Sequence, residues 1–217
     1  MRRPVDWGLY LVTDRGLAGA RPLGELVRAA VRGGATVIQL REKNCSTREF
    51  IDLAREVKAV LDREGIPLII NDRVDVALAA GADGVHVGQS DMDYRDARTL
   101  MGKEALVGLS VETPEQAEEA AGLDADYLGV SPIFSTPTKT DTTTEWGIAG
   151  LARLRKRSRH RLVAIGGINA GNAASVLRAG ADGIAVVSAI CASADPEAAA
   201  RELRAIVEQN RTWRQRQ

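Results

Sequence analysis

The chain has 217 residues, of which 45% are hydrophobic and 27% charged, a composition typical of a globular domain. Lys plus Arg and Asp plus Glu both number 29, so no global field attracts nucleic acid or an anionic membrane. No apolar run approaches the roughly 20 residues that span a bilayer, and the N-terminal segment lacks the apolar core of a secretory signal. Cys45 and Cys191 are too few for a disulfide scaffold. We therefore expect a cytoplasmic protein with small-molecule partners and no nucleic-acid or membrane partner; a homo-oligomer stays open.

Short β-branched runs alternate with amphipathic segments along the chain, as in repeated strand-helix units on a parallel sheet. Eight runs predict strands, at residues 8–14, 36–42, 67–72, 84–88, 106–111, 127–133, 162–168 and 183–188. After the second run, Phe50, Ala54 and Val57 recur at helical spacing. Ser46 and Glu49 predict a capping box at the start of that helix.

A small turn phrase built on Gly-Ala recurs at residues 32–35, 80–84 and 179–183. Glycine there supplies the left-handed conformation that ends a helix before the next strand. Eight such units without a linker predict an α/β fold, a single (β/α)₈ TIM barrel, because a doubly wound sheet usually has about five or six strands. We expect one domain over residues 1–217, with its core at about 8–207 and a basic, frayed tail at 208–217.

The connection after the sixth predicted strand is long. Residues 134–146 are polar and contain no glycine. Long loops at the C-terminal ends of barrel strands are usually functional, so we expect a lid. Thr136, Thr138 and Lys139 give this lid two hydroxyls and a positive charge, which suit a phosphate.

The second predicted strand ends in a polar face. Its two-residue period puts Gln39, Arg41 and Lys43 on one side, with Ile38 and Leu40 on the other. A barrel strand covered by helices can solvate Arg41 only at the barrel mouth, so an anion such as pyrophosphate is the expected partner.

Two carboxylates follow the third and fourth predicted strands. Asp72 and Asp91 should meet at one end of the barrel, and Mg²⁺ is commonly held by one or two carboxylates plus substrate phosphates. The alternative is structural: Asp72 caps the helix that begins near Val74, and Asp91 is a turn residue.

The seventh and eighth predicted strands end in Gly166-Gly167 and in Val187-Ser188. These loops form the recurrent phosphate site of such barrels. Of the two histidines, we expect His86 to be a hydrogen-bonded barrel residue and His160 to lie on a surface turn. The sequence contains no evident Ser-His-Asp arrangement.

Taken together, these motifs resemble the thiamine-phosphate synthase family over about residues 8 to 207. The motifs lie at residues 9–14, 39–43, 70–72, 85–91, 132–134, 136–139, 165–168 and 179–190. The resemblance implies a transferase that joins a pyrimidine methyl pyrophosphate to a thiazole phosphate with loss of pyrophosphate.

The resemblance also implies roles for individual residues. The implied pyrimidine pyrophosphate site consists of Gln39, Arg41, Lys43, Asn71, Ser110 and Lys139. The implied thiazole phosphate site consists of Thr136, Thr138, Gly167, Val187 and Ser188, and further substrate contacts come from Leu40, Glu42 and Pro137. Arg41, Lys43, Ser110 and Lys139 are the implied catalytic residues, and Asp72 and Asp91 the implied Mg²⁺ ligands.

The chain departs from the family at two places. Ser131 stands where the family usually has glycine, and residues 142–146 replace small residues and proline. Two alternatives stay open: a thiazole tautomerase relative, which would not need the paired carboxylates, and a non-catalytic regulator that binds thiazole phosphate.

Overall fold

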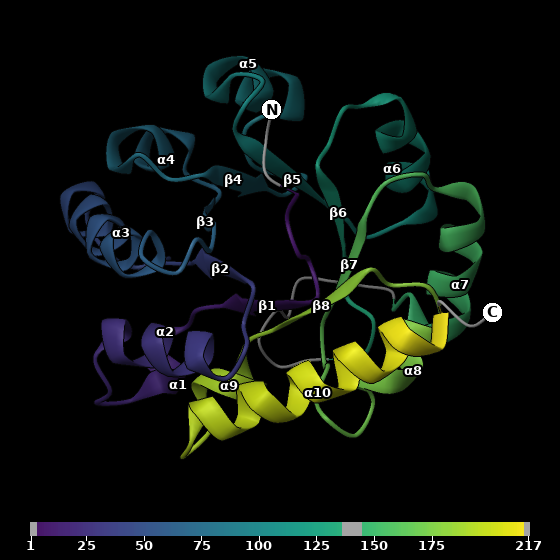
Figure 1. Cartoon of the computed structure of the whole chain (residues 1–217). Helices are drawn as coiled ribbons and strands as arrows, with labels where there is room; N and C mark the ends of the chain where they lie inside the picture. Colours follow the sequence, from purple (N-terminus) through teal and green to yellow (C-terminus); the bar gives the residue numbers. More distant parts are fainter. Residues whose placement is uncertain (1–3, 136–144, 215–217) are drawn as a thin grey trace.

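The computed structural model describes residues 4–135 and 145–214, with side chains as far as residue 212. In this part of the chain, parallel strands close into a barrel in sequence order, with helices outside it (Figure 1). The strands are β1 Leu9–Val12, β2 Val37–Leu40, β3 Leu68–Asn71, β4 Gly84–Val87, β5 Leu106–Val111, β6 Tyr127–Val130, β7 Leu162–Ile165 and β8 Gly183–Val186. The predicted TIM barrel is confirmed, and each strand lies within its predicted range.

Helices follow the strands and form the outer layer (Figure 1). They are α2 Leu23–Arg32, α3 Thr47–Leu61, α4 Val74–Ala80, α5 Tyr94–Met101, α6 Pro114–Glu119, α7 Gly147–Arg157, α8 Ala173–Arg178 and α10 Pro196–Arg214. Short helices follow β1 (α1, Arg15–Ala18), α6 (η1, Ala120–Gly122) and β8 (α9, Ser188–Cys191). Half of the predicted capping box is present in α3: the Ser46 hydroxyl accepts a hydrogen bond from the Glu49 N–H at 3.2 Å, while the Glu49 carboxylate accepts from Arg15.

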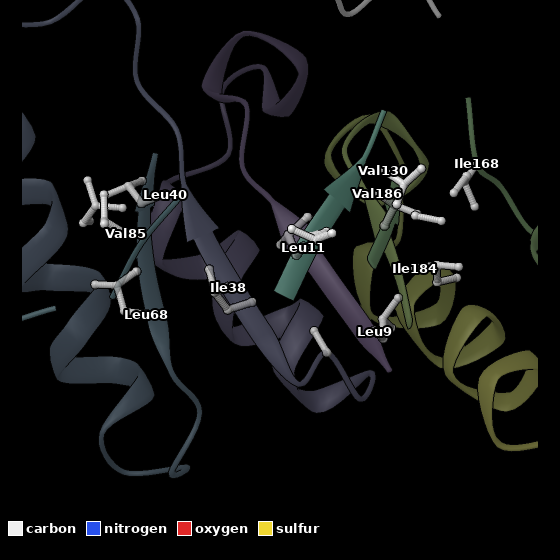
Figure 2. Close-up of a cluster of buried hydrophobic side chains, with 14 of the residues drawn as sticks. Leu9, Leu11, Ile38, Leu40, Leu68, Val85, Val130, Ile168, Ile184 and Val186 are labelled. Carbon is white, nitrogen blue, oxygen red and sulfur yellow. The ribbon is translucent and has the colours of Figure 1, made fainter. Parts of the chain in front are cut away.

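Alternation along the strands divides the core into two layers. Leu9, Leu11 and Ile38 point outward into the layer between barrel and helices, which Figure 2 shows in part. Tyr10 and Val37 point into the barrel and pack with other inward side chains. The inward layer is therefore where a polar side chain can reach the mouth of the barrel.

A carboxylate contact recurs where strands begin. Three Asp residues stand just before β4, β6 and β8. Each accepts a hydrogen bond at 2.8 Å from a backbone N–H near the start of β3, β5 or β7: Asp83 from Leu68, Asp126 from Val107 and Asp182 from Leu162. Each also pairs with a cation: Asp83 with Lys58, Asp126 with Arg98, and Asp182 with Arg155. We call these three the strand-start carboxylates. These contacts explain why the turns at residues 80–84 and 179–183 contain Asp. All three carboxylates lie at the N-terminal end of the barrel, the end associated with stability.

The predicted frayed tail from residue 208 is wrong over residues 208–212. Helix α10 continues to Arg214 and packs between α2 and α8 (Figure 1). Asn210 is buried, and Arg211 donates hydrogen bonds to Asp6, which also accepts from Arg204 at 2.9 Å. Arg204 and Arg211 therefore hold α10 against the N-terminal segment through the Asp6 carboxylate.

His160 is also placed differently from the prediction of a surface turn. Its side chain is buried, and its Nε2–H donates to the Leu123 carbonyl at 3.0 Å.

Among the described helices, none is long and apolar enough to cross a membrane.

We expect Asp126→Ala to lower the free energy of unfolding by about 2 kcal/mol, because the Val107 N–H and Arg98 lose a largely buried acceptor. Urea denaturation measures this loss. Asp124→Ala is the control: that carboxylate also contacts Arg98 but is 73% exposed, so its loss should cost less than about 1 kcal/mol. Equal losses in the two variants would contradict a special role for the strand-start carboxylates.

Asp6→Asn should destabilise the chain by roughly 1 kcal/mol at neutral pH, after allowance for solvent around the pair. Burial raises the pKa of Asp6, but hydrogen bonds from Arg211, the Gly8 N–H and Arg204 outweigh it and leave the pKa well below its ordinary value. A lowered carboxyl pKa stabilises the fold above the unfolded-state value and is lost as pH falls.

The gap in unfolding free energy between wild type and Asp6→Asn should therefore shrink below about pH 4. Glu208→Gln is the control, since Glu208 contacts the same two arginines but is 48% exposed. A gap that stays constant between neutral and acid pH would count against this ion pair as its source.

Candidate active site

A cavity of about 710 Å³ opens at the C-terminal ends of the barrel strands. Every strand contributes to its wall, either from its last inward residues or from the loop that follows. The volume lies in the range of small-molecule sites, roughly 300–1,000 Å³. The mouth of the barrel is therefore the candidate active site.

The tip of β2 supplies the polar face that its alternation predicted. Gln39, Arg41 and Lys43 line the cavity, whereas Ile38 and Leu40 are fully buried in the outer layer. The Arg41 N–H donates to the Thr13 hydroxyl at 3.1 Å, which ties this tip to β1. Two cations thus face one cavity, an arrangement suited to an anion.

Asp72 follows β3 and pairs with Lys43, whose Nζ lies 2.5 Å from Asp72 Oδ2. The helix-cap alternative for Asp72 is wrong: α4 is preceded by Arg73, and no side chain caps it. Asp72 has φ of 62°, the left-handed region that few residues other than glycine adopt. This backbone conformation carries the carboxylate into the cavity wall rather than onto the helix.

Asp91 lies beside Asp72. Its Oδ2 accepts from the Gly88 N–H at 2.8 Å, the turn contact that the structural alternative expected. Burial and a hydrogen bond with the Asp72 carboxyl raise the pKa of Asp91. Two adjacent carboxyl groups, one of them with a raised pKa, make a place where a cation is favourable.

The floor of the cavity is a chain of polar side chains, all buried except Ser110, which is half-buried. Gln39 Nε2 donates to the Tyr10 hydroxyl at 2.8 Å, and the Tyr10 and Tyr127 hydroxyls lie 2.7 Å apart. His86 Nδ1 lies 2.8 Å from the Tyr127 hydroxyl, and His86 Nε2 lies 2.8 Å from Ser110 Oγ. We call these five residues the floor chain. His86 is a hydrogen-bonded barrel residue, as predicted.

Glycines make room for the floor chain. A Cβ atom at Gly108 would lie 2.2 Å from Tyr127 Cζ, and one at Gly129 would lie 2.9 Å from His86 Cε1. Both distances are too short for a side chain, so β5 and β6 carry glycine where the rings cross the barrel.

Sequence reasoning missed Tyr10 and Tyr127 as site residues. Both are 1% exposed, and burial raises the pKa of each well above its ordinary value, so each hydroxyl keeps its proton. The available signal was their inward register: a buried tyrosine hydroxyl needs a partner, and Gln39 and His86 share that register.

The opposite wall is built from backbone. Gly166 and Gly167 have φ of 103° and 65°, and a Cβ atom at Gly167 would lie 2.9 Å from Phe134 Cβ. Asn172 Nδ2 donates to the Gly167 carbonyl at 2.9 Å and holds the turn. Val187 and Ser188 line the same cavity, so the two predicted phosphate loops meet.

Most of the predicted site residues within the described ranges come together. Those that line the cavity are Gln39, Arg41, Lys43, Asn71, Asp72, Asp91, Ser110, Gly167, Val187 and Ser188. Leu40 points into the outer layer, and Glu42 accepts from Arg15 Nε at 2.9 Å, so the side chains of these two predicted contacts do not line the cavity. Thr136, Pro137, Thr138 and Lys139 lie outside the described residues, and their roles stay predictions.

Of the two departures from the family that the sequence predicts, Ser131 and Trp146 lie within the described residues. Ser131 lines the cavity, and its N–H donates to the Val111 carbonyl at 3.1 Å. Trp146, at the end of the predicted lid, donates from Nε1 to the same carbonyl at 3.2 Å. The Val111 carbonyl at the end of β5 thus accepts hydrogen bonds from residues on both sides of the gap between the two described ranges.

Known proteins resemble this chain over nearly its full length. The family described as thiamine monophosphate synthase matches residues 9–190. The thiamine-phosphate synthase of Albidiferax ferrireducens is 57% identical over 200 residues, 92% of this chain and 91% of the relative. That of Chloroflexus aurantiacus is 55% identical over 203 residues, 94% of each chain.

A solved structure agrees with these relatives. The thiamine phosphate pyrophosphorylase from Pyrococcus furiosus has a TM-score of 0.87 and 41% identity, covering 94% of this chain and 97% of that one. The fold, the cavity and the sequence matches point the same way: the chain belongs to the thiamine monophosphate synthase family.

Proposed function

We propose that the chain couples 4-amino-2-methyl-5-pyrimidinylmethyl pyrophosphate to 4-methyl-5-(2-phosphooxyethyl)thiazole, giving thiamine phosphate and pyrophosphate. The names of its relatives support this reaction. The observation that carries the proposal is the cavity rim, where Arg41, Lys43 and the Asp72–Asp91 pair face the glycine-rich wall across one space.

The reaction needs charge handling rather than proton transfer. The methylene carbon–oxygen bond breaks and both electrons leave with pyrophosphate, while cationic character develops on the pyrimidine methylene. The thiazole nitrogen lone pair then forms the new carbon–nitrogen bond. That nitrogen carries no proton, so the attack requires no general base.

Arg41 and Lys43 would stabilise the negative charge that grows on the leaving group. This charge is larger in the transition state than in the bound substrate, so cations aimed at it raise the turnover rate. In the free protein, Lys43 is held by Asp72, which keeps its ammonium at the rim before substrate arrives.

Asp72 and Asp91 fit a Mg²⁺ ion. Their carboxyl groups are adjacent, and the raised pKa of Asp91 reflects both its burial and the unfavourable pairing that a cation would relieve. No cluster of three or more metal-ligating side chains occurs in the described ranges, but Mg²⁺ needs only one or two carboxylates when phosphate oxygens and waters complete its shell. Bound there, Mg²⁺ would neutralise pyrophosphate charge.

Incubation with both substrates and Mg²⁺ should release one pyrophosphate for each thiamine phosphate formed. Arg41→Ala should lower kcat about 100-fold, since it removes charge that stabilises the leaving group. Arg48→Ala, on the exposed side of α3, is the control and should keep the wild-type rate. Product chromatography and a pyrophosphate assay measure both rates.

The same incubation tests the alternatives. An isomerised thiazole phosphate without coupling would identify a tautomerase. Thiazole phosphate that binds and is recovered unchanged would identify a regulator. Either result would overturn the proposed reaction.

Asp72→Asn should raise the Mg²⁺ concentration for half-maximal rate about tenfold or more, because one of two carboxylate ligands is lost. Asparagine tolerates the positive φ at this position, so the backbone should be retained. Asp75→Asn is the matched control: its carboxylate is 60% exposed and pairs with Arg73 outside the cavity. A Mg²⁺ titration unchanged by Asp72→Asn would remove Asp72 from the metal site.

A further inference from the structure

The hydrogen bonds of the floor chain all run in one direction, because each side chain has a fixed number of protons to donate. Each tyrosine hydroxyl has one proton to donate, and neutral imidazole has one N–H and one bare nitrogen. The Gln39 side-chain nitrogen faces Tyr10 and can only donate. Tyr10 therefore accepts at this contact and has its own proton left for another partner.

Within the described ranges, the hydroxyl next to Tyr10 is that of Tyr127 at 2.7 Å, and Tyr10 is 1% exposed. Tyr127 accepts the Tyr10 proton and passes its own proton toward His86 Nδ1. An acceptor at Nδ1 leaves the imidazole proton on Nε2, which then donates to Ser110 Oγ. In the reverse direction the Tyr10 proton would point at the Gln39 nitrogen, and a buried donor would lose its bond.

We infer that Gln39 sets the tautomer of His86 through Tyr10 and Tyr127, and thereby turns the Ser110 hydroxyl into a hydrogen-bond donor toward the substrate. Tyr10, Tyr127 and His86 are positioning residues in this scheme, because they act through Ser110. The consequence for substrate rests on the proposed function, whereas the direction of the floor chain does not.

The direction decides which substrate atom can face Ser110. In this direction the hydroxyl oxygen accepts from His86, which leaves its proton to be donated to a ligand in the cavity that Ser110 lines. Gln89 Nε2 donates to the Ser110 carbonyl at 2.6 Å and holds the residue in place. A phosphate oxygen or an unprotonated ring nitrogen is favoured there, whereas the pyrimidine amino group would meet a donor and is disfavoured.

The tautomer can be measured in the substrate-free protein. The chain has only two histidines, so nitrogen NMR of ¹⁵N-labelled histidine gives two ring systems, and a His160→Gln variant identifies the His86 signals. The expected result for wild type is neutral His86 with its proton on Nε2. A proton on Nδ1, or a doubly protonated ring at neutral pH, overturns the inference.

Gln39→Glu tests the control exerted from the far end of the floor chain. A carboxylate accepts, so it should take the Tyr10 proton, reverse each bond and move the His86 proton to Nδ1. Gln89→Glu is the matched control: it adds the same charge to the cavity wall, but in the described structure the Gln89 side chain bonds the Ser110 carbonyl and not the floor chain hydroxyls, so His86 should keep its Nε2 proton. The same tautomer in Gln39→Glu as in wild type overturns the inference.

The effect on substrate is tested with Tyr127→Phe and Ser110→Ala, singly and together. Tyr127→Phe should lower kcat/KM for the pyrimidine pyrophosphate roughly tenfold, the value of one lost oriented hydrogen bond. In the Ser110→Ala background it should have little further effect, because Tyr127 acts through Ser110. Additive losses in the double variant would overturn the positioning role.

These measurements separate the inference from the proposed function. If the chain lacks coupling activity, the wild-type and Gln39→Glu spectra still test the direction of the floor chain. Thermal melting of each variant checks that it is folded, and the wild-type spectrum requires no substitution at all. An active enzyme with the wrong tautomer would overturn this inference alone.

Discussion

The hydrogen bond between the Tyr10 and Tyr127 hydroxyls is the constraint on which the site depends. The two rings lie inside the barrel with their centroids 5.7 Å apart, and Trp7 packs against Tyr127 with a centroid distance of 4.5 Å. A buried hydroxyl must find partners, and these two find Gln39 and His86, whose other polar atoms reach the cavity. The tyrosine pair is thus the boundary between the apolar half of the barrel interior and the half that lines the cavity.

The two ends of the barrel carry charged side chains with different roles. At the strand starts, Asp83, Asp126 and Asp182 accept backbone N–H groups and hold cations, so charge there is neutralised within the protein. At the strand ends, Lys43 pairs with Asp72, while burial and the neighbouring Asp72 raise the pKa of Asp91, and these groups face an open cavity. Stability and binding are therefore assigned to opposite ends of one fold.

Much of this could be predicted from the sequence because it follows from local pattern. The two-residue period of β2 separated Gln39 and Arg41 from Leu40, and the barrel then brought the strand tips together. The helical continuation of residues 208–212 could not be predicted, since it depends on Asp6, about 200 residues away, meeting Arg211. The burial of His160 and the tyrosine pair likewise depend on partners from distant strands and loops.

His86 connects the floor of the cavity to its rim. Its ring lies between Tyr127 and Ser110, and its carbonyl accepts the Asp72 N–H at 2.8 Å. That backbone bond belongs to the residue with positive φ, so the conformation that points Asp72 into the cavity is held from β4. A small shift of β4 would move the Ser110 donor and the Asp72 carboxylate together. His86 of β4 is therefore bonded both to the Ser110 hydroxyl that would face the substrate and to the backbone of Asp72, whose carboxylate would hold its metal ion, which couples the positions of the two groups.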